Sequence, residues 1–130
     1  MTADTHELAQ LAIVLAQAAP EAERSMVSIV VRGALNVKNE WRANAIASSR
    51  EHARRYPYTI NFDIHPMPGG AEADIGPDRS RDDVQASYGA ILEFGSINNA
   101  PHNDGGRALL AEAPRFEAQV VALTERLGRL

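Results

Sequence analysis

Apolar residues recur at helical spacing along the first half of the chain. A first helix is predicted from about Thr5 to Ala19, with Asp4 as its N-cap. A second is predicted from Pro20 to about Ser49, because proline suits the first position of a helix. Residues that step by three or four positions give each helix an apolar stripe. These stripes are Leu8, Leu11, Ala12 and Leu15, and then Val27, Val30, Ala34, Val37, Trp41 and Ala45.

Alternation replaces helical spacing after Pro57. Apolar and polar residues alternate over 58–64, which predicts a strand with one apolar face. Residues 66–70 have the composition of a turn, and weaker alternation over 71–75 predicts a second strand. The two strands are expected to form a hairpin with a five-residue loop.

Helical spacing returns in the last third of the chain. A short helix is predicted over Tyr88–Phe94, with Gly95 as its C-terminal cap at positive φ, followed by a loop over 96–106. A last helix follows, in which Pro114 either makes a kink or begins a new helix. Its stripe is Leu109, Leu110, Phe116, Val120, Leu123 and Leu127. Residues 1–130 are thus expected to form one α+β domain: N-terminal helices including one long helix, a small antiparallel β-sheet built on a hairpin, a short helix and a C-terminal helix.

Two features of the long helix have more than one interpretation. Gly33, near its middle, either permits close packing or is simply tolerated there. The basic residues on its other sides form either a solvated face, or a subunit interface or the lining of a lumen. Those basic residues are Arg24, Arg32, Lys38, Arg42 and Arg50.

Charge and composition narrow the classes of function. The net charge is −4: residues 1–56 hold seven Lys/Arg against six Asp/Glu, and residues 57–130 hold six against eleven. A dedicated nucleic-acid binder would show a concentrated basic face, so DNA contact is expected to be passive. The absence of cysteine excludes disulfides and thiolate metal sites. Neither a signal peptide nor a membrane span is expected.

The candidate catalytic groups do not form a recognised site. Asp63 and His65 share a strand face but lack a third metal ligand, and His102-Asn103-Asp104 lacks the context of a nuclease motif. Ser48 and Ser49 lie near His52 without a further partner. No enzyme activity, metal or cofactor is therefore expected. The alternatives are a small metal-dependent hydrolase using His52, His65 and His102, or a nucleic-acid-binding module.

One segment carries more information. Residues 88–110 read YGAILEFGSINNAPHNDGGRALL. This resembles the signature of the tail-completion (neck and minor tail) proteins of long-tailed phages. Four other stretches resemble the actinobacterial-phage members of that family: residues 33–38, 58–64, 75–78 and 111–116. The first block matches at Tyr88, Leu92, Glu93, Phe94, Gly95 and Ser96. Pro101 and His102 match the following loop, and Ala108 and Leu109 match the start of the last helix. Residues 103–106 depart from the pattern.

The resemblance implies a structural virion protein. Members of that family form rings, commonly of six subunits, between the connector and the tail tube, and DNA passes through. The chain would be made in the host cytoplasm and end in the neck or tail of the virion, against connector and tail-tube proteins. Roles in tail completion, tail termination and head–tail joining are not separated by the sequence.

Two local hypotheses follow. The side chain of Glu93 is either exposed, or bound to loop amides or to an arginine of the next subunit. A head-to-tail ring would also pair the basic helix of one copy with the acidic region of the next. The candidate interface residues are Arg24, Arg32, Lys38 and Arg42 on one side, and Asp78 and Asp82 on the other.

Overall fold

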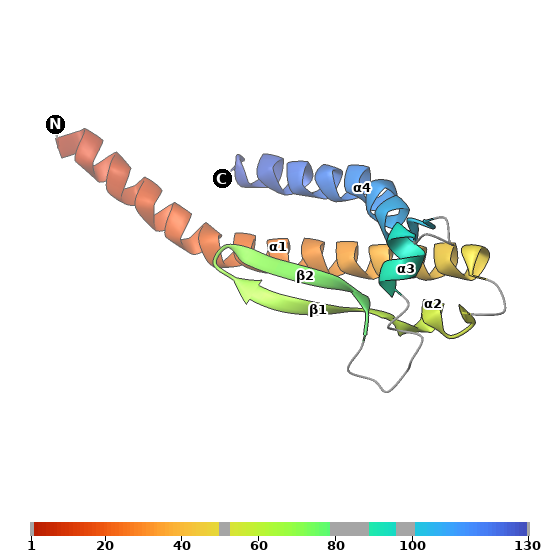
Figure 1. Cartoon of the computed structure of the whole chain (residues 1–130). Helices are drawn as coiled ribbons and strands as arrows, with labels where there is room; N and C mark the ends of the chain where they lie inside the picture. Colours follow the sequence, from red (N-terminus) through yellow and green to blue (C-terminus); the bar gives the residue numbers. More distant parts are fainter. Residues whose placement is uncertain (1, 50–52, 79–88, 96–100, 130) are drawn as a thin grey trace.

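A computed structural model describes residues 2–49, 53–78, 89–95 and 101–129. In chain order the elements are α1 (Thr2–Ser48), α2 (Tyr56–Thr59), β1 (Ile60–Met67), β2 (Gly70–Pro77), α3 (Gly89–Phe94) and α4 (Asp104–Leu127). The predicted α+β class is confirmed. Helix α1 lies between the other two layers, with the hairpin along one side and α4, running antiparallel, along the other (Figure 1). None of the described helices combines the length and apolarity that a membrane span needs.

The N-terminal region forms one helix where two were predicted. Pro20 lies inside α1 and does not end it. Proline removes one helical hydrogen bond and crowds the preceding turn, so it bends a helix more readily than it starts one in mid-pattern. Figure 1 shows this bend, beyond which the N-terminal part of α1 points away from the rest of the molecule.

The hairpin is longer and tighter than predicted. Its strands pair from Ile60 opposite Pro77 to Met67 opposite Gly70, so the loop has two residues, not five. Pro68 and Gly69 make the turn, with Gly69 at φ +82°, as a Pro-Gly pair at the centre of a type II turn requires. Residues 58 and 59 are not in the strand. They belong to α2, since Pro57 occupies the first turn and the Thr59 hydroxyl closes it on the Tyr56 carbonyl oxygen at 2.7 Å.

The core lies where the C-terminal half of α1 meets α2 and the start of β1. Ala45, Ala53, Tyr56 and Ile60 are buried together, and three half-buried side chains pack on them. Those three are Trp41, Ile75 and Leu92. The predicted stripe of the long helix is confirmed from Val27 to Ala45, where every member is buried or half-buried.

The predictions for the last helix were wrong in part. Leu109 is 60% exposed and Leu110 72% exposed, so neither belongs to the buried face of α4. Leu123 of the predicted stripe is buried, and Ala108 and Glu112 are buried with it. Helix α4 begins at Asp104, inside the predicted loop, and passes through Pro114 without ending. Of the two interpretations of Gly33, close packing is the one found, because a methyl group added there would lie 3.0 Å from the Phe116 ring.

Burial of the Tyr56 hydroxyl gives a test of the core. Burial, and less strongly the charges of Glu93 and Asp104, raise the pKa of Tyr56 to about 12, although a polar contact with Trp41 opposes the rise. Below about pH 10 both folded and unfolded chains hold the proton. Between about pH 10 and 12 only the folded chain holds it, so the free energy of unfolding should fall by up to roughly 2.7 kcal/mol. Urea unfolding across this range should show the loss, and Tyr56→Phe should lack that part of it. Equal pH dependence in both proteins would contradict the burial of this hydroxyl.

Candidate functional site

The segment that carries the family resemblance forms the junction between α3 and α4. Gly95 follows α3 at φ +78°, which confirms its predicted cap conformation. The returning chain then closes the end of α3, because the N–H of His102 donates to the Leu92 carbonyl at 2.7 Å. The N–H of Asn103 donates to the Glu93 carbonyl at 3.1 Å. Two carbonyls that a helix end leaves without partners are thereby bonded.

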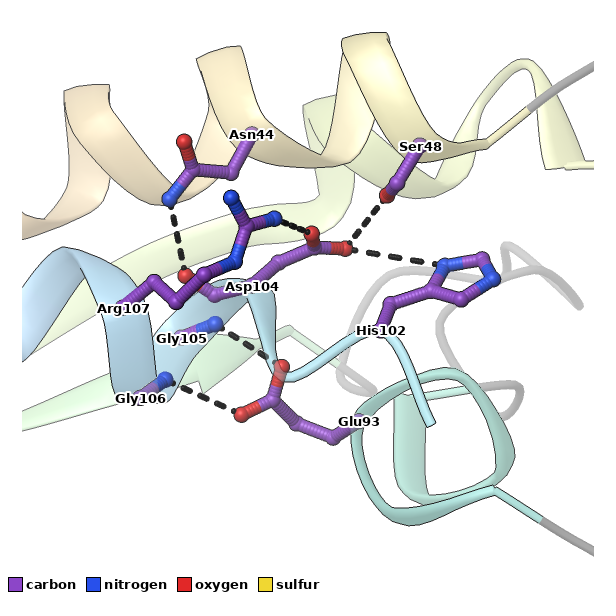
Figure 2. A network of polar contacts seen from close by, with 8 residues as sticks. All are labelled: Asn44, Ser48, Glu93, His102, Asp104, Gly105, Gly106 and Arg107. Carbon is purple, nitrogen blue, oxygen red and sulfur yellow. Dashed lines mark hydrogen bonds and ion pairs between the residues drawn. The ribbon is translucent and has the colours of Figure 1, made fainter. Parts of the chain in front are cut away.

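Glu93 binds the start of α4. Its Oε1 accepts a hydrogen bond from the Gly105 N–H at 2.8 Å, and its Oε2 accepts one from the Gly106 N–H at 3.1 Å (Figure 2). The first N–H groups of a helix lack helical partners and carry its positive dipole end, so a carboxylate is stabilised there. Of the alternatives for Glu93, binding to backbone amides of the segment predicted as a loop is the one found. In the structure these amides belong to the first turn of α4.

Asp104 fastens the same helix start to α1. Its side chain is 1% exposed. Oδ2 accepts a hydrogen bond from the Ser48 hydroxyl at 2.7 Å, and Oδ1 accepts one from the Arg107 guanidinium at 2.7 Å (Figure 2). The Asp104 carbonyl oxygen accepts a further bond from the Asn44 amide at 3.0 Å. A buried carboxylate is tolerated only with such donors.

His102 completes this network without forming a nucleophile–base pair. Its Nδ1 lies 3.7 Å from Asp104 Oδ2, and this nitrogen is buried with no hydrogen bond. The Ser48 hydroxyl bonds to Asp104, so the serine that sequence placed near His52 is held by a carboxylate. His52 lies outside the described residues. In a catalytic triad for acyl transfer, the histidine lies between the serine and the carboxylate and accepts the proton of the serine. Here the carboxylate of Asp104 lies between Ser48 and His102, so the histidine does not contact the serine hydroxyl.

The strand histidine pairs across the hairpin. His65 Nε2 lies 2.9 Å from Asp74 Oδ2, and both side chains are exposed. Asp63, its predicted neighbour on the polar face, is exposed and stands opposite Asp74 in the register. Among the described residues, no three His, Asp or Glu side chains are grouped closely enough to hold a metal ion.

The remaining signature residues are divided between core and surface. Leu92 packs on the core, whereas Phe94 is 78% exposed and Leu109 is also exposed. Pro101 is exposed in the returning chain. Tyr88 and Ser96 lie outside the described residues.

Some of the candidate interface residues are exposed, and others make contacts within the chain. Arg24 and Arg32 are exposed. Arg42 is used within the chain: its Nε and Nη2 donate to the Ile60 carbonyl at 3.0 and 2.7 Å.

Lys38 and Asp78 also face inward. The Lys38 ammonium lies 5.7 Å from the centre of the Phe62 ring. Lys38, Arg42 and Asp78 line the same cavity of about 120 Å³. Two residues of the basic helix therefore share a cavity with Asp78 of the same chain. Charge reversal at Arg42 would remove its hydrogen bonds to Ile60, and so disturb the fold as well as any interface. Asp82 lies outside the described residues.

Sequence reasoning missed the role of Asp104 and the contact beside it. A methyl group added at Gly105 would lie 2.7 Å from the Trp41 ring, so α4 approaches α1 closely only because residue 105 has no side chain. The pair Asn103-Asp104 ahead of a helical pattern is itself a signal for the start of a helix. The two glycines that follow it are typical of a loop, and they led to the prediction of a loop over these residues.

No family model, curated protein or solved structure matches this chain.

Glu93 should stabilise the fold through its position at the start of α4. In Glu93→Gln an amide NH₂ would face the N–H of Gly105 or Gly106, placing two donors together. We expect the free energy of unfolding to fall by about 1 to 3 kcal/mol. Glu117→Gln, an exposed change on α4, is the control and should change the free energy of unfolding little. Urea unfolding of both variants measures the difference, and equal small effects would contradict the role of Glu93.

Gly105→Ala should strain the packing of α4 on α1. Its methyl group would overlap the Trp41 ring, and such overpacking costs about 1 to 3 kcal/mol. Gly128→Ala, at the other end of the helix, is the matched control, since the nearest atom there would be 3.5 Å away. Melting temperatures of the two variants test this, and a Gly105→Ala protein as stable as the control would show that α4 lies further from Trp41.

Proposed function

We propose that this chain is a structural subunit of the neck or tail end of a tailed phage, which assembles into a ring through which DNA passes. Its neighbours would be copies of itself, connector proteins and tail-tube proteins. The ring would complete, terminate or join the tail without catalysing a reaction.

The junction between α3 and α4 is the observation that carries the proposal. The residues on which the family resemblance rests have mechanical roles: Glu93 holds the start of α4, Gly95 turns the chain, and the backbone of His102 closes α3. Such roles suit a segment that fixes the shape of a building block. An enzyme signature would instead present reactive groups to a pocket.

The surface of the chain also supports assembly. Several large apolar side chains are exposed in a domain that buries few residues of this kind. Contact with other subunits would remove such side chains from water and so favour assembly. The exposed residues include Phe94, Leu109, Leu110, Tyr58 and Ile46.

The charge distribution supports a passive relation to DNA. The net charge is −4, and two of the basic residues of α1, Lys38 and Arg42, are engaged within the chain. A lumen that must let DNA slide should not bind its phosphates tightly, because each phosphate contact adds affinity that depends on salt.

The mass of the purified chain in solution tests the proposal. Light scattering after size-exclusion chromatography should give a closed oligomer, and negative-stain images should show rings with a central hole. Assembly should persist at high salt, because apolar contacts resist screening. A monomer at every concentration and salt tested would overturn the ring. A monomer that binds duplex DNA with a steep salt dependence would favour a nucleic-acid-binding module instead.

A further inference from the structure

An apolar groove runs between β2 and α4, with α1 as its floor. It encloses about 330 Å³ and is lined by apolar side chains or glycine, apart from Glu112. Side chains that define it are Val30, Val37, Ala73, Ile75, Leu109 and Phe116. Because an apolar cavity of about 150 Å³ can hold a benzene molecule, this groove has room for roughly two leucine-sized side chains.

The one charged residue of the groove is already partnered. Glu112 is 6% exposed, and its Oε1 accepts a hydrogen bond from the Asn36 amide at 3.1 Å. The Arg115 guanidinium lies 3.2 Å from Oε2. The groove therefore suits an apolar occupant and does not require one with a counter-charge.

The same chain has a helical arm that leaves the body of the molecule. We define this N-terminal arm as residues 2–19 of α1. The hairpin turn ends beside Met26, where a methyl group on Gly70 would meet its side chain at 3.3 Å, and Arg126 near the end of α4 bonds to Ser25. The arm lies beyond both, and Figure 1 shows no other described element alongside it.

The sequence of the arm contains an apolar stripe. Leu8, Leu11, Ala12 and Leu15 recur at the spacing of one helical face, although Ile13 and Val14 fall outside that stripe. Gln10 falls on the opposite face. Eighteen residues of helix span about 27 Å, so the arm is long enough to reach across a neighbouring subunit.

The arm of one chain is excluded from the groove of the same chain. Helix α1 is continuous from the arm through Val30 and Val37, which are the floor of the groove. The arm would have to fold back upon its own helix to enter that groove, and the bend in α1 points the arm outward (Figure 1). A second copy is the occupant that the topology allows.

We propose that the N-terminal arm of one copy lies in the apolar groove of the next and inserts its leucine face there. This contact is heterologous, because each copy offers an arm on one surface and a groove on another. A repeated contact of this kind closes into a ring when the rotation from one copy to the next divides a full turn, and otherwise gives an open filament. The inference rests on the proposed ring and names the contact that holds it together.

Chemical cross-linking in a chain without native cysteine tests the contact directly. Leu11→Cys and Leu109→Cys are introduced together, and a short bifunctional thiol reagent is added to the assembled protein. A groove filled by a neighbour's arm gives a ladder of covalent dimers, trimers and larger species on a denaturing gel. The matched control combines Leu11→Cys with Ala118→Cys, an exposed position on the opposite face of α4, and should give little ladder.

A second pair of variants keeps the proposal independent of cysteine chemistry. Leu11→Glu should raise the concentration for half-assembly at least about tenfold, because one buried leucine contributes more than about 1.4 kcal/mol. Gln10→Glu adds the same charge on the other face and should leave assembly unchanged. At concentrations at which neither variant assembles, both should melt at the same temperature, because the arm lies outside the body of the chain and assembly no longer contributes to stability.

The outcomes separate the contact from the function. If the wild-type chain forms rings but the Leu11–Leu109 pair cross-links no more than the control, the arm contact is wrong and the ring stands. Rings that Leu11→Glu leaves unaffected would likewise contradict the arm contact alone. If the wild-type chain stays monomeric, the ring itself is wrong and the contact falls with it.

Discussion

Two carboxylates hold the first turn of α4, and the arrangement of the whole C-terminal half depends on them. Glu93 reaches this turn from α3 and binds two backbone N–H groups, while Asp104 reaches from the turn to Ser48 of α1. Either carboxylate alone would be costly to remove from water. Each has at least two donors, so the charges link three helices at one point and set where α4 begins.

Glycine then determines how closely the two long helices approach. Gly105 of α4 lies against the Trp41 ring of α1, and Gly33 of α1 lies against the Phe116 ring of α4. Each helix therefore contributes one glycine and one aromatic ring to the contact between them. A methyl group at Gly105 would lie 2.7 Å from the Trp41 ring, so either the ring or the helix would have to shift, whereas one at Gly33 would lie 3.0 Å from the Phe116 ring and require a smaller adjustment. The carboxylates at the junction fix the first of these contacts, and the antiparallel direction of α4 brings Phe116 to the second.

The sequence predicted those parts of the fold that depend on local pattern. The stripe from Val27 to Ala45, the hairpin and the short helix with its cap at Gly95 follow from spacing and from the conformational freedom of glycine. The start of α4 was missed because its stability comes from Glu93, more than ten residues earlier in the chain. Leu109 was predicted to be buried but is exposed, because helical spacing shows only which residues share a face. The close approach of α4 to α1 at Gly105 decides which face of α4 turns toward α1.

The small core explains why such a chain would need neighbours. Its central cluster contains two alanines, one tyrosine and one isoleucine, and among the described residues it lies at the end of the molecule near the junction. Further along α1, between β2 and α4, the apolar side chains enclose a groove and do not close over it. A domain of this size buries too little surface to leave such a groove open at no cost in stability. Filling the groove with leucine side chains from a second copy would remove apolar surface from water on both partners, so folding and assembly would be coupled through mass action.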